Sequence, residues 1–483
     1  MKETRKPPRG ARPRPVKPSG GLRAWRADAA DGAKAERSQR QDGKDLAGLS
    51  ARQLAVELIE AVLVSSRSLD DALEAADGNP QFRRLEPRDR GFARLIAATV
   101  LRRKGSLEAV LARFLERPLP ASAPRPRSIL LAGAAQVLMI GTPVHAAINL
   151  AVEQCRRDKA AERFDKLTNA VLRRVASQGP AILDELDTPR IDIPDWLWTK
   201  WVEAYGEAGA TRIANASLAE APLDLTVKSD GQAWAERLGG ELLATGSVRL
   251  KDAGRVEDLE GFKDGAWWVQ DAAAALPARL LGDVAGLDVA DLCAAPGGKS
   301  AELASAGARV TAIDLSAERL ARLEANVARL GLGERVEVVV ADLLAYETDR
   351  AFDAVLLDAP CLATGTIRRH PDLMHLKRPS DLERIVALQG RLLDRAGALV
   401  KPGGRLVYCV CSIEPEEGEH VVKAFLEAHP EFERKPVVPS EIRGSIDWLT
   451  RAGDLRTLPF HEPSPGSPGM DGFYAARLSR RVS

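Results

Sequence analysis

Two hydrophobic patterns divide the chain into a front and a back half. Between residues 51 and 176, apolar side chains recur every three or four positions in six segments that Gly, Pro and Asp separate. This spacing predicts amphipathic helices and an all-α domain over residues 49–178. From residue 286 onward, short runs of Val, Ile and Leu alternate with helical segments. Such alternation predicts a Rossmann-like α/β domain over residues 286–483, with a mostly parallel, seven-stranded sheet covered by helices on both faces.

The stretch between these domains, residues 179–285, predicts a connector and a small α+β element. Strand-like residues 223–228, helical residues 232–239 and an extended segment at 247–261 follow one another there. Trp196, Trp198 and Trp201 lie close together before them, and fixing a helix by packing is a more common role for such a cluster than stacking RNA bases. Near the end of the chain, residues 456–460 and 471–478 predict an antiparallel hairpin that closes the large sheet.

Composition indicates a soluble, multidomain protein in a reducing compartment. The chain has 483 residues, of which 45% are hydrophobic and 28% charged, and these values argue against a disordered, collagen-like or membrane protein. Five cysteines are too few for a disulfide framework, so we expect free thiols. The first thirty residues are basic and proline-rich without the apolar stretch of a secretory signal, which favours the cytoplasm. Residues 128–152 are long enough to span a bilayer, but a break at residues 141–143 predicts two buried core helices instead.

Charge is distributed unevenly, although the formal net charge is only +1. Residues 1–50 contain thirteen Lys and Arg against six Asp and Glu, and residues 51–178 contain twenty-one against fourteen. A basic front half on an acidic back half favours a nucleic-acid-binding attachment, with ordinary solvated surface charge as the alternative. Residues 1–48, rich in Pro, Gly, Arg and Lys, predict a disordered basic tail whose arginines contact phosphates without sequence preference.

The first strand of the α/β pattern runs into a glycine-rich turn, DLCAAPGGKS over residues 291–300. The turn precedes a helix N-terminus, which favours an anionic group, and it differs from the G-x-G-x-x-G sequence of dinucleotide sites. The second strand ends at Asp314, where a carboxylate can accept hydrogen bonds from a ribose, and the third ends at Asp342, near an adenine amino group. These strand ends together predict S-adenosylmethionine as the cofactor.

The fourth and fifth strands bring acids and thiols to the same edge. The fourth leads to Asp358 and Cys361, and the fifth leads to Cys409 and Cys411. Side chains two positions apart in a strand face the same side, so alternation alone does not choose between the last two thiols. Cys411 lies nearer the strand's end and is the one expected to face the ligand, whereas Cys409 and Cys155 are expected in the core. The cysteines lack the C-x-x-C pairs and histidine clusters of zinc sites, so we expect no metal.

These motifs are similar to those of known families. DLCAAPGGK, DAPCLATGTIRRHPD, CSIEPEE and the closing DGFY resemble the Sun/Fmu branch of the NOL/NOP/Sun family of RNA cytosine-carbon-5 methyltransferases. In the helical domain, TPVHAAINLAVE and LTNAVLRRV resemble the NusB family of RNA-binding antitermination factors. The combination implies the architecture of the bacterial enzyme for 16S ribosomal RNA. Where the family has Thr, Ser and Asn, this chain has Val410, Leu362 and Gly418, which affects fine tuning rather than activity.

The resemblance implies a role for each catalytic residue. Cys411 is the nucleophile, and Cys361 is the thiol that assists product release. By the same resemblance, the residues that contact S-adenosylmethionine or the base are Cys293, Ala294, Ala295, Pro296, Gly297, Gly298, Lys299, Asp314, Asp342 and Asp358. Carbon 5 of cytosine is a weak nucleophile, and addition of a thiolate at carbon 6 makes it carbanion-like, which is covalent catalysis by cysteine. Asp358 can hold or donate a proton at the ring nitrogen as electrons move into the ring. A base must then remove the carbon-5 proton so that Cys411 is expelled.

The expected substrate is 16S ribosomal RNA, free or in an assembling small subunit, bound by a monomer without membrane or DNA contacts. An enzyme can reach the base only in an unpaired or flipped nucleotide. Basic side chains in the motif that contains His370, and shortly after it, are candidates to bind the phosphates of this nucleotide. The alternative is that they are ordinary surface charges. These predicted RNA-binding residues are Arg368, Arg369, Lys377 and Arg378.

Three other functions remain open on the sequence alone. A non-catalytic RNA-binding factor could use the fold as a scaffold, but a scaffold needs neither Cys361 nor Cys411. A transfer RNA methyltransferase is a second alternative, and only the resemblance favours ribosomal RNA over it. DNA cytosine methyltransferases are a third alternative. They attack with the cysteine of a Pro-Cys motif, to which Pro360 and Cys361 are similar, but they lack the second thiol and the NusB-like domain.

Overall fold

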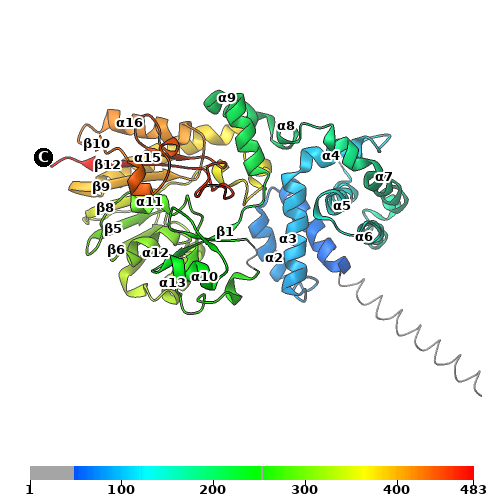
Figure 1. Ribbon diagram of the computed structural model, residues 1–483, viewed down its shortest axis with the longest axis horizontal. Helices are drawn as coiled ribbons and strands as arrows, with labels where there is room; N and C mark the ends of the chain where they lie inside the picture. Colours follow the sequence, from blue (N-terminus) through cyan, green and yellow to red (C-terminus); the bar gives the residue numbers. More distant parts are fainter. Residues whose placement is uncertain (1–47, 121, 252–253, 483) are drawn as a thin grey trace, which may run out of the picture.

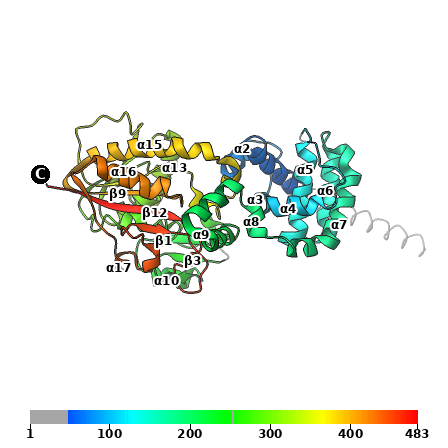
Figure 2. The same ribbon diagram turned by 90° about the horizontal axis from the view of Figure 1, so that it is seen from above.

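A computed structural model describes residues 48–120, 122–251 and 254–482. A helical domain lies on one side of the molecule and an α/β domain on the other, with α8 and α9 at their junction (Figure 1, Figure 2). The predicted disordered tail falls, apart from its last residue, outside the described residues. Within those residues, no helix combines the length and the hydropathy that crossing a bilayer requires.

The helical domain is built around a central helix, α5 (Pro124–Ala135), most of which is buried. Apolar residues at helical spacing cover it on several sides, as the sequence predicts, and the predicted break occurs at Gly141, whose φ of 74° ends the preceding turn. Besides residues 48–63, the helices are α2 (Leu69–Asp77), α3 (Pro87–Arg102), α4 (Lys104–Ala112), η1 (Gln136–Ile140), α6 (Val144–Arg157), η2 (Glu162–Phe164) and α7 (Asp165–Asp184).

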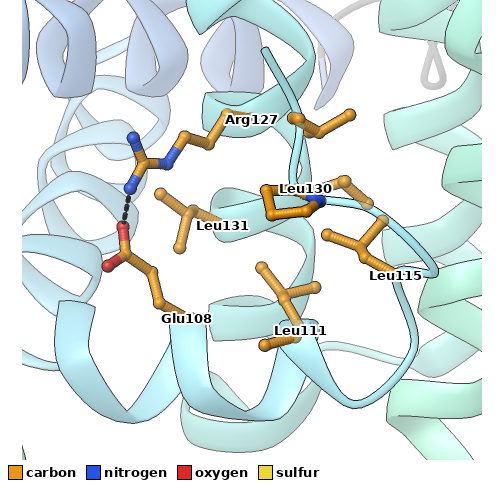
Figure 3. Close-up of a pocket in the computed structure, with 9 residues that line it drawn as sticks. Glu108, Leu111, Leu115, Arg127, Leu130 and Leu131 are labelled. Carbon is orange, nitrogen blue, oxygen red and sulfur yellow. Dashed lines mark hydrogen bonds and ion pairs between the residues drawn. The ribbon is translucent and has the colours of Figure 1, made fainter. Parts of the chain in front are cut away.

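A cavity of about 450 Å³ opens between α4 and α5. Leu111, Leu115, Leu130 and Leu131 point into it, and an ion pair between Arg127 and Glu108 closes one side (Figure 3).

The connector consists of α8 (Thr188–Asp192) and α9 (Asp195–Ser217). Trp201 on α9 is fully buried, and its indole donates a hydrogen bond to the Glu414 carboxylate at 3.2 Å. The tryptophan cluster therefore packs, as the sequence predicts, and it packs against the segment that follows Cys411.

A small antiparallel sheet follows, with strand order β2-β3-β1-β4. Its elements are β1 (Leu223–Val227), α10 (Gly231–Arg237), β2 (Glu241–Leu242), β3 (Val248–Leu250), η3 (Val256–Asp258) and β4 (Trp267–Val269). Inside it, the buried Arg249 guanidinium binds both carboxylate oxygens of Asp224 at 2.7 Å. This is the predicted α+β element.

The large sheet has eight strands among the described residues, in the order β10-β12-β9-β8-β5-β6-β7, with β11 paired to β12. From β9 to β7 the strands are parallel, and β12 is antiparallel to β9. The sheet is mostly parallel as predicted, and β11 forms the predicted hairpin with β12; the addition to the predicted seven strands is the three-residue β10, which pairs with β12. The strands are β5 (Asp288–Leu292), β6 (Arg309–Asp314), β7 (Val336–Val340), β8 (Phe352–Asp358), β9 (Val400–Val410), β10 (Phe432–Arg434), β11 (Leu455–Thr457) and β12 (Phe473–Arg480).

Both faces of this sheet are buried, which explains the uninterrupted apolar runs of its strands. Along β8, Leu356 belongs to the apolar cluster on one face and its neighbours Val355 and Leu357 to the cluster on the other. The remaining helices are α11 (Leu276–Arg279), α12 (Gly298–Ser305), α13 (Ala317–Arg329), η4 (Gly333–Arg335), η5 (Thr364–Thr366), α14 (Leu373–Leu376), α15 (Pro379–Ala398), η6 (Glu416–His420), α16 (Val421–Ala428), α17 (Pro439–Ile442) and η7 (Ile446–Trp448).

Candidate active site

The glycine-rich turn lies between β5 and α12, where the sequence places it. Gly297 has a φ of 100°, and a Cβ there would lie 2.5 Å from Leu323 Cγ, so the turn requires glycine. The Gly297 N–H donates to the Ala294 carbonyl, and α12 begins at Gly298. Cys293 also has a positive φ, 60°, and burial raises the pKa of its thiol to about 12. This thiol therefore remains protonated at neutral pH.

The predicted ribose-binding acid, Asp314, is tied to this turn. The carboxylate is buried at the end of β6; one oxygen accepts from the Ala295 N–H at 3.1 Å and the other from the Ser316 N–H at 3.0 Å. Asp342, after β7, is exposed and accepts from the Leu344 N–H at 3.0 Å. Each carboxylate has further lone pairs for the hydroxyl and amino donors of a nucleoside, so the donor set fits S-adenosylmethionine.

Lys299 lies away from these two acids and beside Asp358. Its ammonium is 2.8 Å from Asp358 Oδ2 and 5.1 Å from the centre of the Phe473 ring. Burial alone would lower the pKa of Lys299, but the charge of Asp358 and its hydrogen bond with Lys299 raise it above its ordinary value. The lysine is therefore a permanent positive charge next to the thiols.

The two predicted catalytic thiols meet at the ends of neighbouring strands. Cys361 Sγ and Cys411 Sγ are 3.4 Å apart, and both cysteines are free. The hydrogen bond to Cys411, together with burial, raises the pKa of Cys361 above its ordinary value. Cys409 is fully buried, as predicted, with Sγ 3.5 Å from Asp358 Oδ1, and Cys155 lies in the core of the helical domain.

Glu417 holds the two thiol-bearing segments together. Its buried carboxylate accepts from the Leu362 N–H at 2.9 Å, beside Cys361, and from the Ser412 hydroxyl at 2.5 Å, beside Cys411. Gln389 of α15 donates to the same carboxylate at 2.9 Å. Glu417 was given no role from the sequence, although it ends the CSIEPEE motif, and its place six residues after Cys411 was the available signal.

A pocket of about 450 Å³ opens onto this group. Cys411, Asp358 and Lys299 line it, together with Pro296, Gly297 and Gly298 of the turn, whereas Cys361 is outside its lining. Asp271 and Asp471 also line the pocket and were missed, because they are two hundred residues apart and the closing DGFY motif, which begins with Asp471, gave no role to its acid. The described residues contain no group of three or more His, Cys, Asp or Glu that could hold a metal ion.

The four predicted RNA-binding side chains separate into two kinds. Lys377 is half-buried and Arg378 is exposed. Arg368 is only 4% exposed and binds Asp271 and Asp471 at 3.0 and 2.7 Å, and Arg369 binds the same two carboxylates. For Arg368 and Arg369 the structure corrects the picture of free surface charge, because a phosphate would have to displace two buried carboxylates.

Known protein families and full-length relatives match most of the chain. The family described as 16S rRNA methyltransferase RsmB/F matches residues 280–479, and the NusB family matches residues 49–177. Ribosomal RNA small subunit methyltransferase B of Xanthomonas campestris is 34% identical over 448 residues, covering 89% of this chain and 97% of that protein. The Vibrio cholerae protein of the same name is 33% identical, over 90% of this chain and 98% of its own.

A solved structure has the same fold. The crystal structure of PH0851 covers 90% of this chain and 99% of its own, with a TM-score of 0.68 and 23% identity. Because full-length relatives exceed 30% identity, the chain belongs to the ribosomal RNA small subunit methyltransferase B family, in which a NusB-like domain precedes an RsmB/F methyltransferase domain.

Proposed function

We propose that this protein methylates carbon 5 of a cytosine in 16S ribosomal RNA through a covalent adduct between Cys411 and carbon 6. S-adenosylmethionine is the methyl donor of this family, and bound at the turn it supplies an electrophilic methyl group. The observation that carries the proposal is the pair of thiols 3.4 Å apart beside Asp358 and Lys299. A non-catalytic scaffold has no need of this pair.

The positions of the two thiols support different roles. Cys411 lines the pocket, and the Lys299 ammonium nearby stabilises a thiolate, which is the attacking form of cysteine. Cys361 is outside the lining, 3.4 Å from Cys411, and the pKa of its thiol is raised. We therefore assign addition at carbon 6 to Cys411 and assistance in product release to Cys361.

Asp358 is placed to hold the base. The Lys299 ammonium, 2.8 Å from Asp358 Oδ2, orients this carboxyl group, which can accept from the cytosine amino group and, when protonated, donate its proton to the ring nitrogen. As sulfur bonds to carbon 6, the ring electrons move toward that nitrogen, and carbon 5 gains the electron density that methyl transfer needs. Removal of the carbon-5 proton then returns electrons to the ring, breaks the bond from carbon 6 to sulfur and releases Cys411 as a thiolate.

The proposal includes the substrate and the compartment. The unmodified 16S ribosomal RNA, free or in an assembling subunit, is the substrate, and Asp314 and Asp342 bind the ribose and adenine of the cofactor. Lys377 and Arg378 are assigned to phosphates. Free thiols in the catalytic pair favour the reducing cytoplasm.

The test separates the thiols on unmodified 16S RNA. Cys411→Ala should abolish methyl transfer and form no covalent complex, because nothing else adds to carbon 6. Cys361→Ala should methylate once and stall, leaving a slow band on a denaturing gel that requires S-adenosylmethionine and disappears with ribonuclease. Cys155→Ala, which removes a buried thiol of the helical domain, is the matched control and should behave as the wild type. A covalent band from Cys411→Ala with none from Cys361→Ala would reverse the two roles.

A further inference from the structure

The segment from Cys361 to His375, here called the strap, runs from the catalytic thiol pair to the helical domain. At its first end, the Gly365 N–H donates to the Cys411 carbonyl at 3.0 Å, and the Gly472 N–H donates to the Gly365 carbonyl at 2.9 Å. A Cβ on Gly365 would lie 2.0 Å from the Gly472 carbonyl oxygen, so this crossing has no room for a side chain. The strap is thus fixed directly against the strand end that carries Cys411.

In its middle, the strap is held by a buried cluster of two arginines and two aspartates. Arg368 donates to Asp471, Asp271 and the Gly469 carbonyl, at 2.7, 3.0 and 2.6 Å. Arg369 contacts both carboxylates and donates to the Pro222 carbonyl at 3.0 Å. Burial alone would raise the pKa of Asp271, but the two guanidinium groups hold it below its ordinary value. The cluster therefore joins the strap to the small sheet and to the turn before β12.

At its far end, the strap is contacted repeatedly by the helical domain. Arg102 of α3 donates to the Arg368 carbonyl at 3.1 Å, and the Leu69 N–H at the start of α2 donates to Asp372 Oδ2 at 3.1 Å. The ring of His375 hydrogen-bonds the Leu101 carbonyl at 2.8 Å. The Asp70 carboxylate lies 3.5 Å from His370, and His370 also lines the catalytic pocket.

We infer that the helical domain positions the active site through the strap, in addition to any contact it makes with RNA. Arg102 and Asp372 are then positioning residues that act through Arg368 on the placement of Cys361 against Cys411. The inference rests on the proposed function, because it assigns the strap an effect on the step in which Cys361 releases the product. A helical domain that served only to bind RNA would need no contact with the segment that carries a catalytic thiol.

The test uses full-length protein, S-adenosylmethionine and unmodified 16S RNA. Arg102→Met and Asp372→Ala should lower the turnover rate at saturating RNA by about 10- to 100-fold, the scale expected when a catalytic group is displaced by about 1 Å. RNA affinity should stay within about twofold of the wild type, because phosphate contacts rather than the strap set it. The covalent complex should accumulate, which is also the result expected of Cys361→Ala.

Two controls separate positioning from general damage. Asp372→Asn keeps an oxygen that accepts from the Leu69 N–H and should restore turnover. Glu74→Gln removes the negative charge from an exposed ion pair with Arg322 that joins the same two domains away from the strap, and it should leave turnover unchanged. Thermal unfolding of each variant identifies loss of fold; if Asp372→Ala does not fold, the comparison of Arg102→Met with Glu74→Gln decides.

Normal turnover in Arg102→Met and Asp372→Ala, or a loss confined to RNA affinity, would overturn the inference while leaving the proposed function intact. Equal loss in Glu74→Gln would also overturn it, because any disturbance of the domain junction would then suffice. If wild-type protein and Cys361→Ala both fail to methylate the RNA, the proposed function fails instead.

Discussion

The two cavities described above have similar volumes, about 450 Å³ each, and opposite linings. Leucines dominate the cavity of the helical domain, where a single ion pair lies at the edge (Figure 3). The pocket at the sheet edge contains a thiol, several carboxylates and a buried lysine. Two cavities of equal volume therefore differ in chemistry. Only the pocket at the sheet edge brings titratable groups from separate strands within hydrogen-bonding distance of one another.

The largest expected difference between the two cavities is catalytic. Asp358→Asn should lower the single-turnover methylation rate by about 10²–10⁴-fold, the usual contribution of a group that holds or moves a proton. The matched control is Asp353→Asn at the other end of β8, where the carboxylate binds Lys401 at 2.7 Å, far from the pocket. A normal rate in Asp358→Asn would remove this residue from the chemistry.

The sheet edge also shows which parts of a site a sequence can reveal. Parallel strands end at one edge, so the alternation of strands and helices was enough to bring Asp314, Asp358, Cys361 and Cys411 together. Cys409 was separable from Cys411 by its distance from the strand's end. These predictions used only local pattern and the topology that the pattern implies.

Pairings between distant segments were outside the reach of that reasoning. Arg368 and Arg369 look like surface charge in the sequence, because their partners Asp271 and Asp471 stand one hundred residues away on either side. The site of Gly418 is similar: a Cβ there would lie 2.6 Å from Arg456 and 2.8 Å from Tyr474, so a larger residue would require these two side chains to move. Burial of a charged residue depends on such partners, which no periodicity encodes.

The helical cavity should matter for stability and not for catalysis. Leu111 is nearly buried, and Leu111→Ala should lower the free energy of unfolding by about 2 kcal/mol, the low end for leucine because part of the space beside it is already empty. Leu107→Ala, at a fully buried position of the same helix, should cost more. Chemical denaturation measures both, and the methylation rate of each folded variant should equal that of the wild type.

Cofactor affinity should depend on side chains at the carboxyl edge of the large sheet and not on the helical cavity. Asp314→Ala should weaken S-adenosylmethionine by about 1.5–3 kcal/mol, because buried hydrogen bonds to a charged acceptor are lost. Asp288→Ala is the control: that acid lies at the opposite end of β5 and pairs with Arg309 at 2.8 Å. Isothermal calorimetry with both variants tests the assignment, and an unchanged affinity in Asp314→Ala would place the ribose elsewhere.

The smallest effect is expected at the ion pair that closes the helical cavity. Arg127 is about half exposed, and Glu108 also pairs with Lys104 at 3.1 Å, so the carboxylate keeps a partner when Arg127 is replaced. Arg127→Gln should therefore change the free energy of unfolding by less than about 1 kcal/mol, and less still at high salt, because exposed charges are screened. A double-mutant cycle with Glu108→Gln in low and high salt measures the pair directly. If Arg127→Gln instead weakened RNA binding or slowed methylation, the leucine-lined cavity would have a functional rim, and the contrast between the two cavities would no longer separate packing from chemistry.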